Sequence, residues 1–471
     1  MLFGSFILKN TSMKNVFLFS LSVIFAIQSF SQNNPPINWQ LMDWKQDGYP
    51  GISIEKACNE LLKDKKPLKK IIVAVMDFGV DTSHPDLAGI FWTNKKEIPG
   101  NGIDDDHNGF VDDVHGWNFG GNAIHGTMES VREYVRLRTR YENLKDTAAL
   151  VDDEGYRYWK KVLAQKEKER NNFVQDSKTV IEKGDPAYWR KKELGDDPYK
   201  NDSLPSGNNN IYYKRPGEIH ATCIAGVIGA LRNNKIGGNG ITNSVEIMPI
   251  VRTFGDEEWD KDIANGIRYA VDNGAQVINM SLGKYLSPQK EWVIDAMKYA
   301  EQHEVLLVAA AGNESQNIDS NTLYPFAYSN NNIISNLIRV GASTYDSTLV
   351  APFSNYGKKT VDVFAPGLKV YTTSIKGTYF WFAGTSCATP MVAGLAAFIW
   401  SYYPSFNYRQ IKYCIEKSAE PINDLVKKPG ASERVPFSSL SRTGGIVNAF
   451  NAIKIAEQIQ SGRIVINESN Y

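Results

Sequence analysis

Short runs of apolar residues alternate with segments of helical spacing along this chain, and this alternation restricts the fold more than any other feature. Residues 263–273 and 292–301 carry apolar side chains at helical intervals. The short runs that read as strands are residues 69–76, 245–251, 276–280 and 305–310. Strands buried on both faces and separated by helices belong to parallel sheets. We therefore predict an α/β fold, in which a doubly wound and mostly parallel sheet has helices on both faces.

Three polar residues follow strand-like runs. Asp77 follows the first run, Ser281 follows the third, and Asn313 comes shortly after the fourth. In an open parallel sheet, functional residues gather at the carboxyl ends of the strands. We therefore expect these three side chains to lie along one edge of the sheet.

The length and charge of the chain limit its class and its partners. One large α/β domain with an insertion fits its 471 residues, as do two or three average domains. Its 52 basic residues balance its 52 acidic residues. Because there is no basic excess, we expect neither a nucleic acid nor an anionic membrane as a partner. The oligomeric state stays open.

Residues 121–214 interrupt the alternation of strands and helices. Residues 128–144 and 156–183 are long, charged and helix-prone, whereas residues 196–210 are polar and rich in turn formers. At about 90 residues, this segment is too long for a bare loop, so we predict a helical insertion with its own structure. One interpretation is a solvated helical hairpin packed on the core, and the other is a lid or a surface for a partner.

The first 31 residues have the pattern of an export signal. Lys14 precedes an apolar run at residues 16–27, and the small residues Ser29 and Ser31 suit cleavage before Gln32. The run is shorter than the roughly 20 residues that a membrane-spanning helix needs. We therefore predict an exported protein, periplasmic or extracellular, without stable membrane insertion.

Three separate segments carry a reactive trio of residue types. They contain Asp77, His220 and Ser386, in that order along the chain. A serine hydroxyl is a weak nucleophile until a neighbouring imidazole takes its proton. A carboxylate holds that imidazole in the right tautomer and stabilises the imidazolium that forms.

These segments resemble the motifs of the subtilisin-like serine proteases, the subtilases. Residues 77–79 are similar to the aspartate motif of that family, and residues 220–226 to its histidine motif. Residues 384–394 are similar to its serine motif, which opens a buried helix. The similarity covers residues 38–120 and 215–455. It implies the subtilisin-like form of the α/β fold, interrupted by the helical insertion.

The resemblance also implies a function, that of a secreted serine endopeptidase that hydrolyses peptide bonds through an acyl-enzyme on Ser386. His220 would act as general base and then as general acid, and Asp77 would orient it. Asn313 would donate its amide to the oxyanion, a contribution of roughly 3–4 kcal/mol. The segment that would pair with an extended polypeptide substrate, as an added strand, consists of Ser281, Leu282 and Gly283.

Two other residues compete for the catalytic roles. His125 opens a second His-Gly-Thr segment, but a charged helical pattern follows it, whereas small apolar residues follow His220. Asp81 is close to Asp77 but lies past the turn, where a structural loop acid is expected. The sequence therefore favours His220 and Asp77.

The chain departs from the family pattern around the trio. Phe78 stands where a small hydroxyl residue is usual, Ala221 where a glycine is usual, and Cys223 where a second histidine is usual. No catalytic group is lost. Two alternatives to an active protease therefore remain, a catalytically impaired binding protein with the same fold and an interaction protein that acts through its helical insertion.

The same observations divide the chain into segments. We predict a signal peptide at 1–31, an N-terminal segment at 32–70, a catalytic domain at 71–456 that contains the insertion, and a tail at 457–471.

Four cysteines in an exported protein permit disulfides. Cys223 and Cys387 lie inside the histidine and serine motifs, where they could form a redox switch or act as small buried apolar residues. We favour burial, because free cysteine is commonly buried.

Three acids, Asp256, Glu257 and Glu258, follow the strand that the resemblance places beside the substrate cleft. One hypothesis is that they favour cationic substrate side chains upstream of the cleaved bond. A solvated acidic turn is the alternative, because surface charges often have no part in binding.

Residues 101–113 are crowded with acids and predict a structural calcium site. Oxygen-bearing residues at alternate positions, followed by a glycine, suit a hard cation. The expected ligands are Asp104, Asp106, Asn108 and Asp112. His115 stands where an EF-hand has its bidentate glutamate, so this is not an EF-hand. Crowded aspartates repel one another unless a cation lies among them, although an acidic turn held by its own hydrogen bonds is the alternative.

Overall fold

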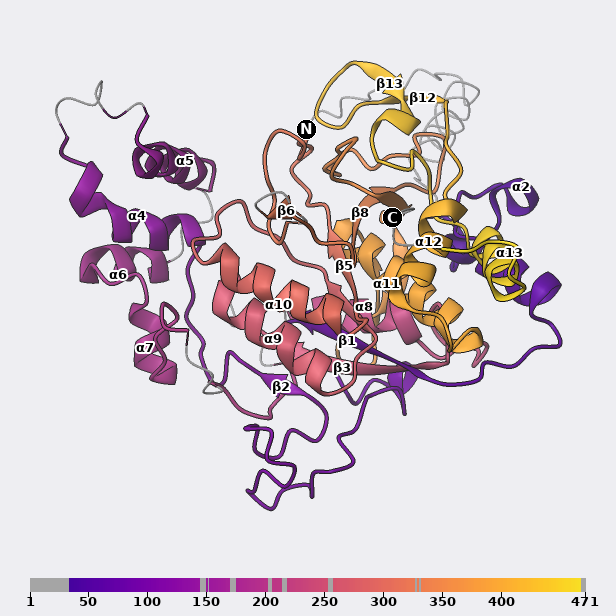
Figure 1. Cartoon of the computed structure of the whole chain (residues 1–471), viewed down its shortest axis with the longest axis horizontal. Coiled ribbons are helices and arrows are strands. Elements are labelled where there is room, and N and C mark those ends of the chain that lie inside the picture. The colour runs from indigo at the N-terminus through magenta and orange to yellow at the C-terminus, as the bar shows by residue number, and fades with distance from the viewer. Residues whose placement is uncertain are drawn as a thin grey trace, which may run out of the picture. The chain divides into compact units, whose positions relative to one another are not determined.

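The computed structural model describes the chain from residue 34 to residue 466 apart from short gaps, and shows a sheet with helices packed against it (Figure 1). The gaps are residues 145–149, 151, 170–174, 202–205, 214–217, 253–256, 327 and 330–331. The predicted export signal lies outside the described residues. Among the helices that the structure does describe, none is both long and apolar enough to cross a membrane.

A seven-stranded sheet lies at the centre, with the strand order β2-β3-β1-β4-β5-β8-β9 and a parallel register between all neighbours. The strands are β1 (Ile71–Asp77), β2 (Trp117–Asn118), β3 (Val245–Val251), β4 (Val277–Met280), β5 (Leu306–Ala310), β8 (Leu337–Ser343) and β9 (Val363–Pro366). Each of the four runs predicted to be strands is a strand of this sheet. The first strand, β1, lies inside the sheet with later strands on both sides, which confirms the predicted α/β class.

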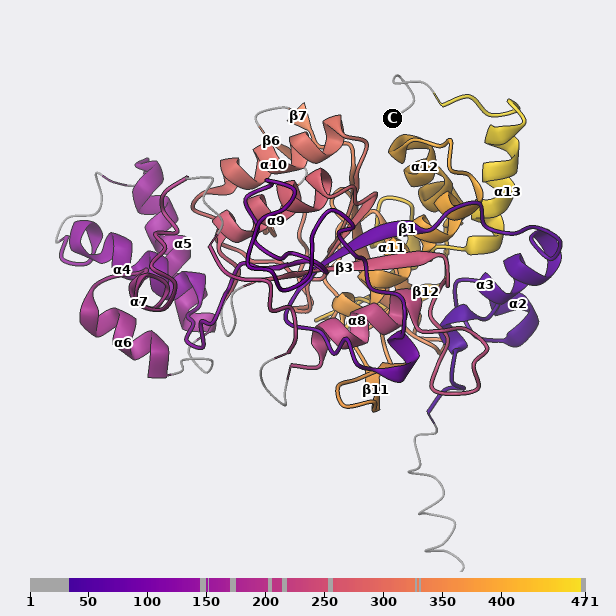
Figure 2. The same cartoon turned by 90° about the horizontal axis from the view of Figure 1, so that it is seen from below.

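Alternate side chains of β1 face opposite layers of helices. Val73 and Val75 lie in one core, and Ala74 and Met76 lie in the other. The first layer contains α8 (His220–Gly229), α11 (Thr385–Tyr402), α12 (Tyr408–Ser418) and α13 (Ala449–Gln460). The second contains α9 (Asp260–Asp272) and α10 (Lys290–Gln302), which lie side by side in Figures 1 and 2. Each fully buried apolar side chain of this kind contributes roughly 1.5–3 kcal/mol to folding.

The compact unit extends beyond both predicted ends of the catalytic domain. Trp39 and Leu41 are fully buried in the first core, and Ile459 at the end of α13 packs into the same core. The short helices before β1 are η1 (Trp39–Leu41), α2 (Trp44–Asp47), α3 (Ile54–Lys56) and η2 (Ala57–Leu61). Residues on both sides of the predicted limits at 71 and 456 thus belong to one unit.

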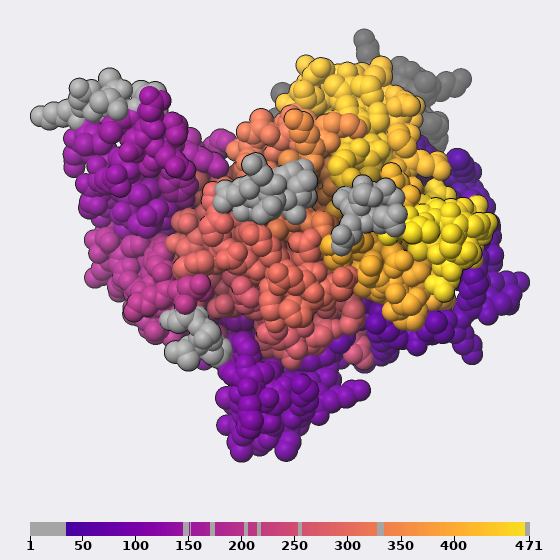
Figure 3. Space-filling view, in the orientation of Figure 1, coloured from indigo at the N-terminus to yellow at the C-terminus, as the bar shows by residue number. Residues whose placement is uncertain are grey.

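The predicted insertion is helical and has a small core of its own. Its helices are α4 (Glu129–Tyr141), α5 (Glu154–Lys168), α6 (Gln175–Lys183) and α7 (Tyr188–Leu194). Val131, Val135 and Val180 form the core, and the Tyr134 ring stacks on Trp159 with centroids 5.6 Å apart. These helices form the purple lobe at the upper left of Figure 3. The pattern predicted the helices before residue 184 but not α7.

Short hairpins and turns complete the described fold. The hairpin of β10 (Val370–Thr373) and β11 (Tyr379–Phe382) leads directly into α11, and sequence analysis did not predict it. The other elements are β6 (Tyr328–Ser329), β7 (Asn332–Ile333), β12 (Leu425–Lys427), β13 (Arg434–Pro436), η3 (Pro85–Leu87) and η6 (Phe437–Ser439).

Candidate active site

Asp77 and His220 meet where β1 ends and α8 begins. The Nδ1 atom of His220 lies 2.8 Å from each carboxylate oxygen of Asp77. Asp77 is 1% exposed, and one of its oxygens also accepts a hydrogen bond from the backbone N–H of Phe78 at 2.7 Å. Because an ionised carboxylate can only accept, His220 donates through Nδ1–H. This tautomer leaves Nε2 of the imidazole with the lone pair that a general base needs.

Ser386 is the second residue of the long apolar helix α11. Its hydroxyl donates to the backbone oxygen of Ser281 at 3.4 Å, and within the described residues it makes no hydrogen bond with His220. A side-chain rotation is therefore needed before proton transfer, and catalytic hydrogen bonds are often long until substrate binds. The position at a helix N-terminus favours the negative charge that develops during attack.

Asn313 presents an amide donor beside Ser386. Its Oδ1 accepts hydrogen bonds from the backbone N–H of Thr385 at 2.8 Å and from the Thr385 hydroxyl at 3.0 Å. Because a backbone N–H can only donate, this contact fixes which end of the Asn313 amide is the oxygen. Thr385 therefore fixes Nδ2 of Asn313 as the donor end of the amide.

Gly384 has no side chain to fill the space between the backbone nitrogen of Ser386 and Nδ2 of Asn313. A methyl group added to Gly384 would lie 3.6 Å from the backbone nitrogen of Ser386 and 3.7 Å from Nδ2 of Asn313. Gly384 also has φ of 136°, a conformation that side chains disfavour. The arrangement can hold an oxyanion between two N–H donors.

The predicted substrate-pairing segment follows β4 directly. The Ser281 hydroxyl donates to the backbone oxygen of Ser386 at 3.0 Å and accepts a hydrogen bond from Nδ2 of Asn279 at 3.0 Å. Ser281 and Leu282 are both 5% exposed, whereas Gly283 is exposed. The structure thus brings the segment into direct contact with the helix that carries the proposed nucleophile.

Two aromatic rings, those of Phe78 and Phe382, pack against the imidazole of His220. The rings of Phe78 and Phe382 meet it edge-on, with centroids at 6.2 Å and 5.4 Å. The guanidinium of Arg252 stacks on Phe78 at 3.9 Å, and Glu258 pairs with Arg252 at 3.1 Å. The unusual Phe78 is therefore held in place by a stacked cation and packs against the base.

All four cysteines are free thiols, Cys58, Cys223, Cys387 and Cys414. Cys223 and Cys387 are fully buried. Burial, together with the nearby charge of Asp77, raises the pKa of Cys223 to about 12. Burial likewise raises the pKa of Cys387 well above its usual range. Protonated, buried thiols are poor nucleophiles, which favours the packing interpretation over a redox switch.

The two rival residues have other roles in the structure. His125 stacks on Trp189 at 3.9 Å within the insertion and pairs with Glu193. Asp81 accepts hydrogen bonds from the backbone N–H of Ser83 and of Lys376, as a structural loop acid does.

The acid-rich loop brings together three carboxylates, Glu97, Asp104 and Asp106. An oxygen from each lies within 4.8 Å of the others. Glu97 is 6% exposed, and its Oε1 accepts from the backbone N–H groups of Asp105 and Asp106 at 2.9 and 3.1 Å. Its Oε2 is buried and has no hydrogen-bond partner among the residues that the structure describes. A buried carboxylate oxygen without a partner is costly, so this atom suits a cation ligand.

Two of the four expected calcium ligands, Asn108 and Asp112, are not part of this cluster of three carboxylates. Asp112 accepts hydrogen bonds from the backbone N–H groups of Gly100, Asn101 and Gly102 at 2.8–3.2 Å. The Asn108 side-chain oxygen accepts from the N–H of Phe110 at 2.8 Å. Asp112 therefore holds a turn. Sequence analysis missed Glu97 because it precedes the spaced motif and only the folded loop returns to it.

The acidic segment after β3 is turned toward the insertion. Glu258 is 5% exposed and pairs with Arg252, while Glu257 accepts a hydrogen bond from the backbone N–H of Glu129 at 2.8 Å. Asp256 lies outside the described residues. These contacts argue against an exposed acidic patch that selects cationic side chains.

Comparison with known proteins gives one consistent result. A family model described as the subtilase family matches residues 68–444. Subtilisin amylosacchariticus from Bacillus subtilis subsp. amylosacchariticus is 38% identical over 220 residues, which are 46% of this chain and 54% of that protein. Thermitase from Thermoactinomyces vulgaris is 35% identical over 247 residues, 52% of this chain and 80% of thermitase. The match thus spans about half the length of the first relative.

A solved structure of a protease from Pseudoalteromonas arctica PAMC 21717 has a similar fold. The two chains share 20% identity with a TM-score of 0.51, over 90% of this chain and 99% of that one. At this identity the similarity concerns the fold alone.

Proposed function

This chain belongs to the subtilase family, and on that premise we propose that it is a serine endopeptidase that hydrolyses peptide bonds in polypeptide substrates. The observation that carries the proposal is the pairing of His220 Nδ1 with the buried carboxylate of Asp77 at 2.8 Å, next to helix α11, whose second residue is Ser386. The family membership supports polypeptides as the substrate class.

In the proposed reaction the Ser386 oxygen attacks the scissile carbonyl carbon while Nε2 of His220 takes the hydroxyl proton. Asp77 stabilises the resulting imidazolium. The backbone N–H of Ser386 and Nδ2 of Asn313 hold the oxyanion. His220 then returns its proton to the leaving amine, which leaves an acyl-enzyme on Ser386. Water, activated by the same imidazole, hydrolyses the ester and restores the hydroxyl.

The segment Ser281–Gly283 is the proposed site for the substrate backbone. Its place directly after β4 and its contact with Ser386 support that role. An extended peptide that adds as a strand gains main-chain hydrogen bonds, which do not depend on its sequence.

Labelling with a fluorophosphonate and cleavage of casein test the proposal. We expect the wild-type protein to be labelled at Ser386 and to cleave casein, and Ser386→Ala to lose both by several orders of magnitude. Ser439→Ala, which removes an exposed hydroxyl far along the chain, is the matched control and should behave as wild type. A wild-type protein that is neither labelled nor active would favour a catalytically impaired binding protein. It would equally favour an interaction protein that acts through the insertion.

We also propose that the mature protein is exported after cleavage of residues 1–31. The pattern around Ser29 and Ser31 supports this. N-terminal sequencing of protein recovered outside the cytoplasm should read from Gln32. Recovery of the uncleaved chain only inside cells would contradict it.

For the loop, we propose a structural calcium site held by Glu97, Asp104 and Asp106. The unpartnered Oε2 of Glu97 and the spacing of the three carboxylates support this set. Calcium there would neutralise the carboxylates and fix the loop, and it would raise stability because only the folded chain offers the ligands.

Thermal melts with calcium and with chelator test the site. Calcium at about 100 times its Kd should add about 2.7 kcal/mol to the free energy of unfolding of the wild type. Glu97→Gln should abolish this gain, whereas Asp105→Asn, with the same change of charge in the same loop, should keep it. A calcium-dependent shift that survives in Glu97→Gln would remove Glu97 from the ligand set.

A further inference from the structure

Lys284 is the residue that directly follows the proposed substrate-pairing segment. Its backbone pairs with Tyr324 through two hydrogen bonds, from N–H of Lys284 at 3.1 Å and from N–H of Tyr324 at 2.8 Å. Its side chain is 1% exposed. A lysine at the end of a substrate-binding strand would ordinarily reach into water, because burying an unpaired ammonium is very unfavourable. Burial at this position therefore needs an explanation.

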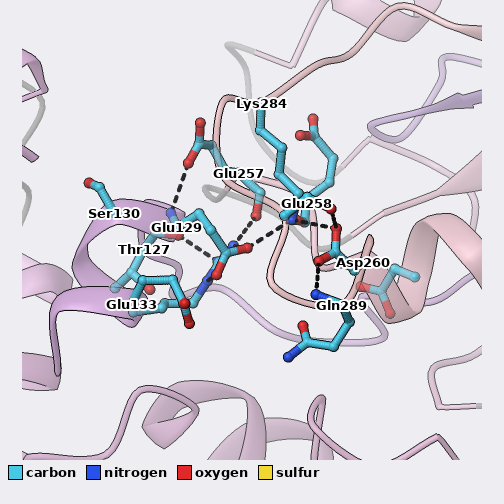
Figure 4. A network of polar contacts seen from close by, with 12 residues as sticks. Thr127, Glu129, Ser130, Glu133, Glu257, Glu258, Asp260, Lys284 and Gln289 are labelled. Atoms are coloured by element: carbon cyan, nitrogen blue, oxygen red, sulfur yellow. Dashed lines mark hydrogen bonds and ion pairs between the residues drawn. The ribbon is translucent and has the colours of Figure 1, made fainter. Parts of the chain in front are cut away.

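The ammonium of Lys284 has an acceptor for each of its three protons. It donates to Oε2 of Glu129 at 2.8 Å and to the backbone oxygen of Glu258 at 2.7 Å, and it lies 2.9 Å from Oδ1 of Asp260. Figure 4 shows the side chain pointing toward Glu129 and Asp260, which come from different parts of the chain. Glu129 opens α4 of the insertion, and Asp260 opens α9 of the core. Lys284 thus connects the insertion, the core and the substrate-pairing segment.

The partners of Lys284 are themselves fixed. Glu129 also pairs with Arg132, which is fully buried. Nη2 of Arg132 donates to Oε2 of Glu129 at 2.9 Å. Arg132 donates to the backbone oxygens of Thr127 at 2.7 Å and Glu257 at 3.0 Å. It also stacks on Trp259 with its carbon 3.9 Å from the ring centroid. The insertion is therefore clamped to residues 257–259 by the same network.

Asp260 completes the network on the core side. Its Oδ1 accepts from the hydroxyl of Ser287 at 2.7 Å, and its Oδ2 accepts from the backbone N–H of Gln289 at 2.8 Å. Two acids, Glu129 and Asp260, thus face the two cations Lys284 and Arg132. Burial alone would lower the pKa of Lys284, but Asp260 and Glu129 hold it above its usual value. Burial opposes ionisation of Glu129, yet Arg132 and Lys284 lower its pKa to about 2.

Buried ion pairs of this kind contribute little net stability, because desolvation offsets the attraction. They do demand defined geometry, because a displaced charge loses its partners and stays buried. A hairpin that only covered the core could dock with apolar side chains alone. The fully paired charges indicate instead that the position of the insertion and the geometry of the segment are coupled.

We propose that Lys284 is a positioning residue through which the helical insertion sets the geometry of the substrate-pairing segment. The proposal rests on the proposed function of that segment. The insertion thereby governs how an extended peptide binds and leaves the chemistry of the triad to the core. A small fluorophosphonate reacts at the serine without an extended backbone, whereas extended peptides need the segment as well.

Two substrates of different length separate these effects. Lys284→Met removes the charge and keeps the stem. We expect its kcat/KM for an extended peptide to fall by about tenfold or more, mainly through KM, because small displacements of a bound substrate are costly. We expect its rate of fluorophosphonate labelling to stay within about twofold of wild type. Glu129→Gln, on the insertion, should give the same pattern, and Lys284→Arg should recover part of the loss.

Arg140→Met is the matched control. Arg140 is exposed on the same helix α4, so both rates should stay at the wild-type level. The double variant Glu129→Gln with Lys284→Met removes both charges together. It should lose less than the sum of the two single variants, because neither charge is left buried alone.

The peptide affinity of Ser386→Ala, with and without Lys284→Met, provides a test that does not need turnover. We expect an uncleaved extended peptide to bind about tenfold more weakly when Lys284 is replaced. Equal affinities would overturn the proposal, and so would an equal loss of labelling and of peptide hydrolysis in Lys284→Met. If the wild type is not labelled, the proposed catalytic function fails, while this binding comparison still decides the role of Lys284. Glu129→Gln serves where Lys284→Met does not fold.

Discussion

Different interactions hold the parts of the core together and hold the helical insertion against the core. In the core, the apolar residues of β1 and α11 pack into one buried hydrophobic cluster. The insertion meets the core through buried charges, Glu129, Arg132, Lys284 and Asp260. Apolar packing is non-directional and tolerates replacement by side chains of similar volume. Paired charges tolerate neither loss nor displacement. The geometry of the contact between the insertion and the core is therefore more strictly defined than the packing within the core.

The difference predicts two kinds of defect. Changes among the reactive groups should lower the rate with little effect on stability, because those groups lie at the edge of a well-packed core. Changes in the charged contact should lower stability or substrate binding. The following variants test this division, from the largest expected effect to the smallest.

Asp77→Asn should reduce kcat by about 10⁴-fold while the fold remains intact. The amide can donate to Nδ1 of His220 and so favours the wrong tautomer. Steady-state kinetics with thermal melts measure both properties. A large loss of stability with a small loss of rate would contradict the expectation that changes among the reactive groups lower the rate and leave stability intact.

Arg132→Met should lower the free energy of unfolding by about 3–5 kcal/mol, because it leaves Glu129 buried beside a single cation. Urea titration of the purified protein measures this. Arg140→Met is the matched control, since Arg140 is exposed on the same helix and should change stability by less than about 0.5 kcal/mol. Equal stabilities of the two variants would show that the buried network does not hold the insertion.

Asn313→Leu should lower kcat by about 10²–10³-fold, roughly 3–4 kcal/mol, with KM little changed. The variant keeps the size of the side chain and removes the donor from the space beside Gly384. The lost contacts with Thr385 should cost about 1 kcal/mol of stability. A change confined to KM would show that Asn313 binds substrate rather than the oxyanion.

Glu257→Gln should have the smallest effect, and one that depends on pH. Burial and the neighbouring Glu169 raise the pKa of Glu257 to about 8 from its ordinary 4.5. The unfolded chain then releases the proton first, so wild-type stability falls as pH rises from 4.5 to 8.

The Gln variant cannot lose that proton. It should be more stable than wild type by about 2 kcal/mol above pH 8, because Glu257 is only partly buried, and equal to wild type near pH 4. Chemical denaturation at several pH values measures the difference. A constant difference across pH would show that Glu257 does not titrate in this window.

Sequence analysis predicted the features that depend on local pattern. The mainly apolar runs before Asp77 and Ser281 are strands, and the run of small residues after His220 is a buried helix. A pattern in a few neighbouring residues carries this information, because the direction of each side chain repeats at a fixed short interval along a strand or a helix.

Features that depend on distant parts of the chain were not predicted. Glu97 joins Asp104 and Asp106 only after the loop folds back, and Asp112 accepts hydrogen bonds from three backbone N–H groups. The sequence leaves Glu257 and Glu258 as either a patch that selects cationic side chains or a solvated turn. In the structure Glu257 accepts a hydrogen bond from the backbone N–H of Glu129, and Glu258 pairs with Arg252. Charged side chains look alike in sequence whether solvated or buried with partners.

The position of β1 in the sheet has a consequence for how the protein is made. β1 is the first strand of this sheet to leave the ribosome, but its neighbours β3 and β4 follow only after the insertion. An apolar strand with two open edges is prone to aggregate until they arrive. The helices of the insertion make local contacts, so they can form early and shorten the open chain between β1 and β3. Ser386 emerges last of the proposed trio and follows all seven strands of the sheet, so the trio can be completed only after every strand has been made.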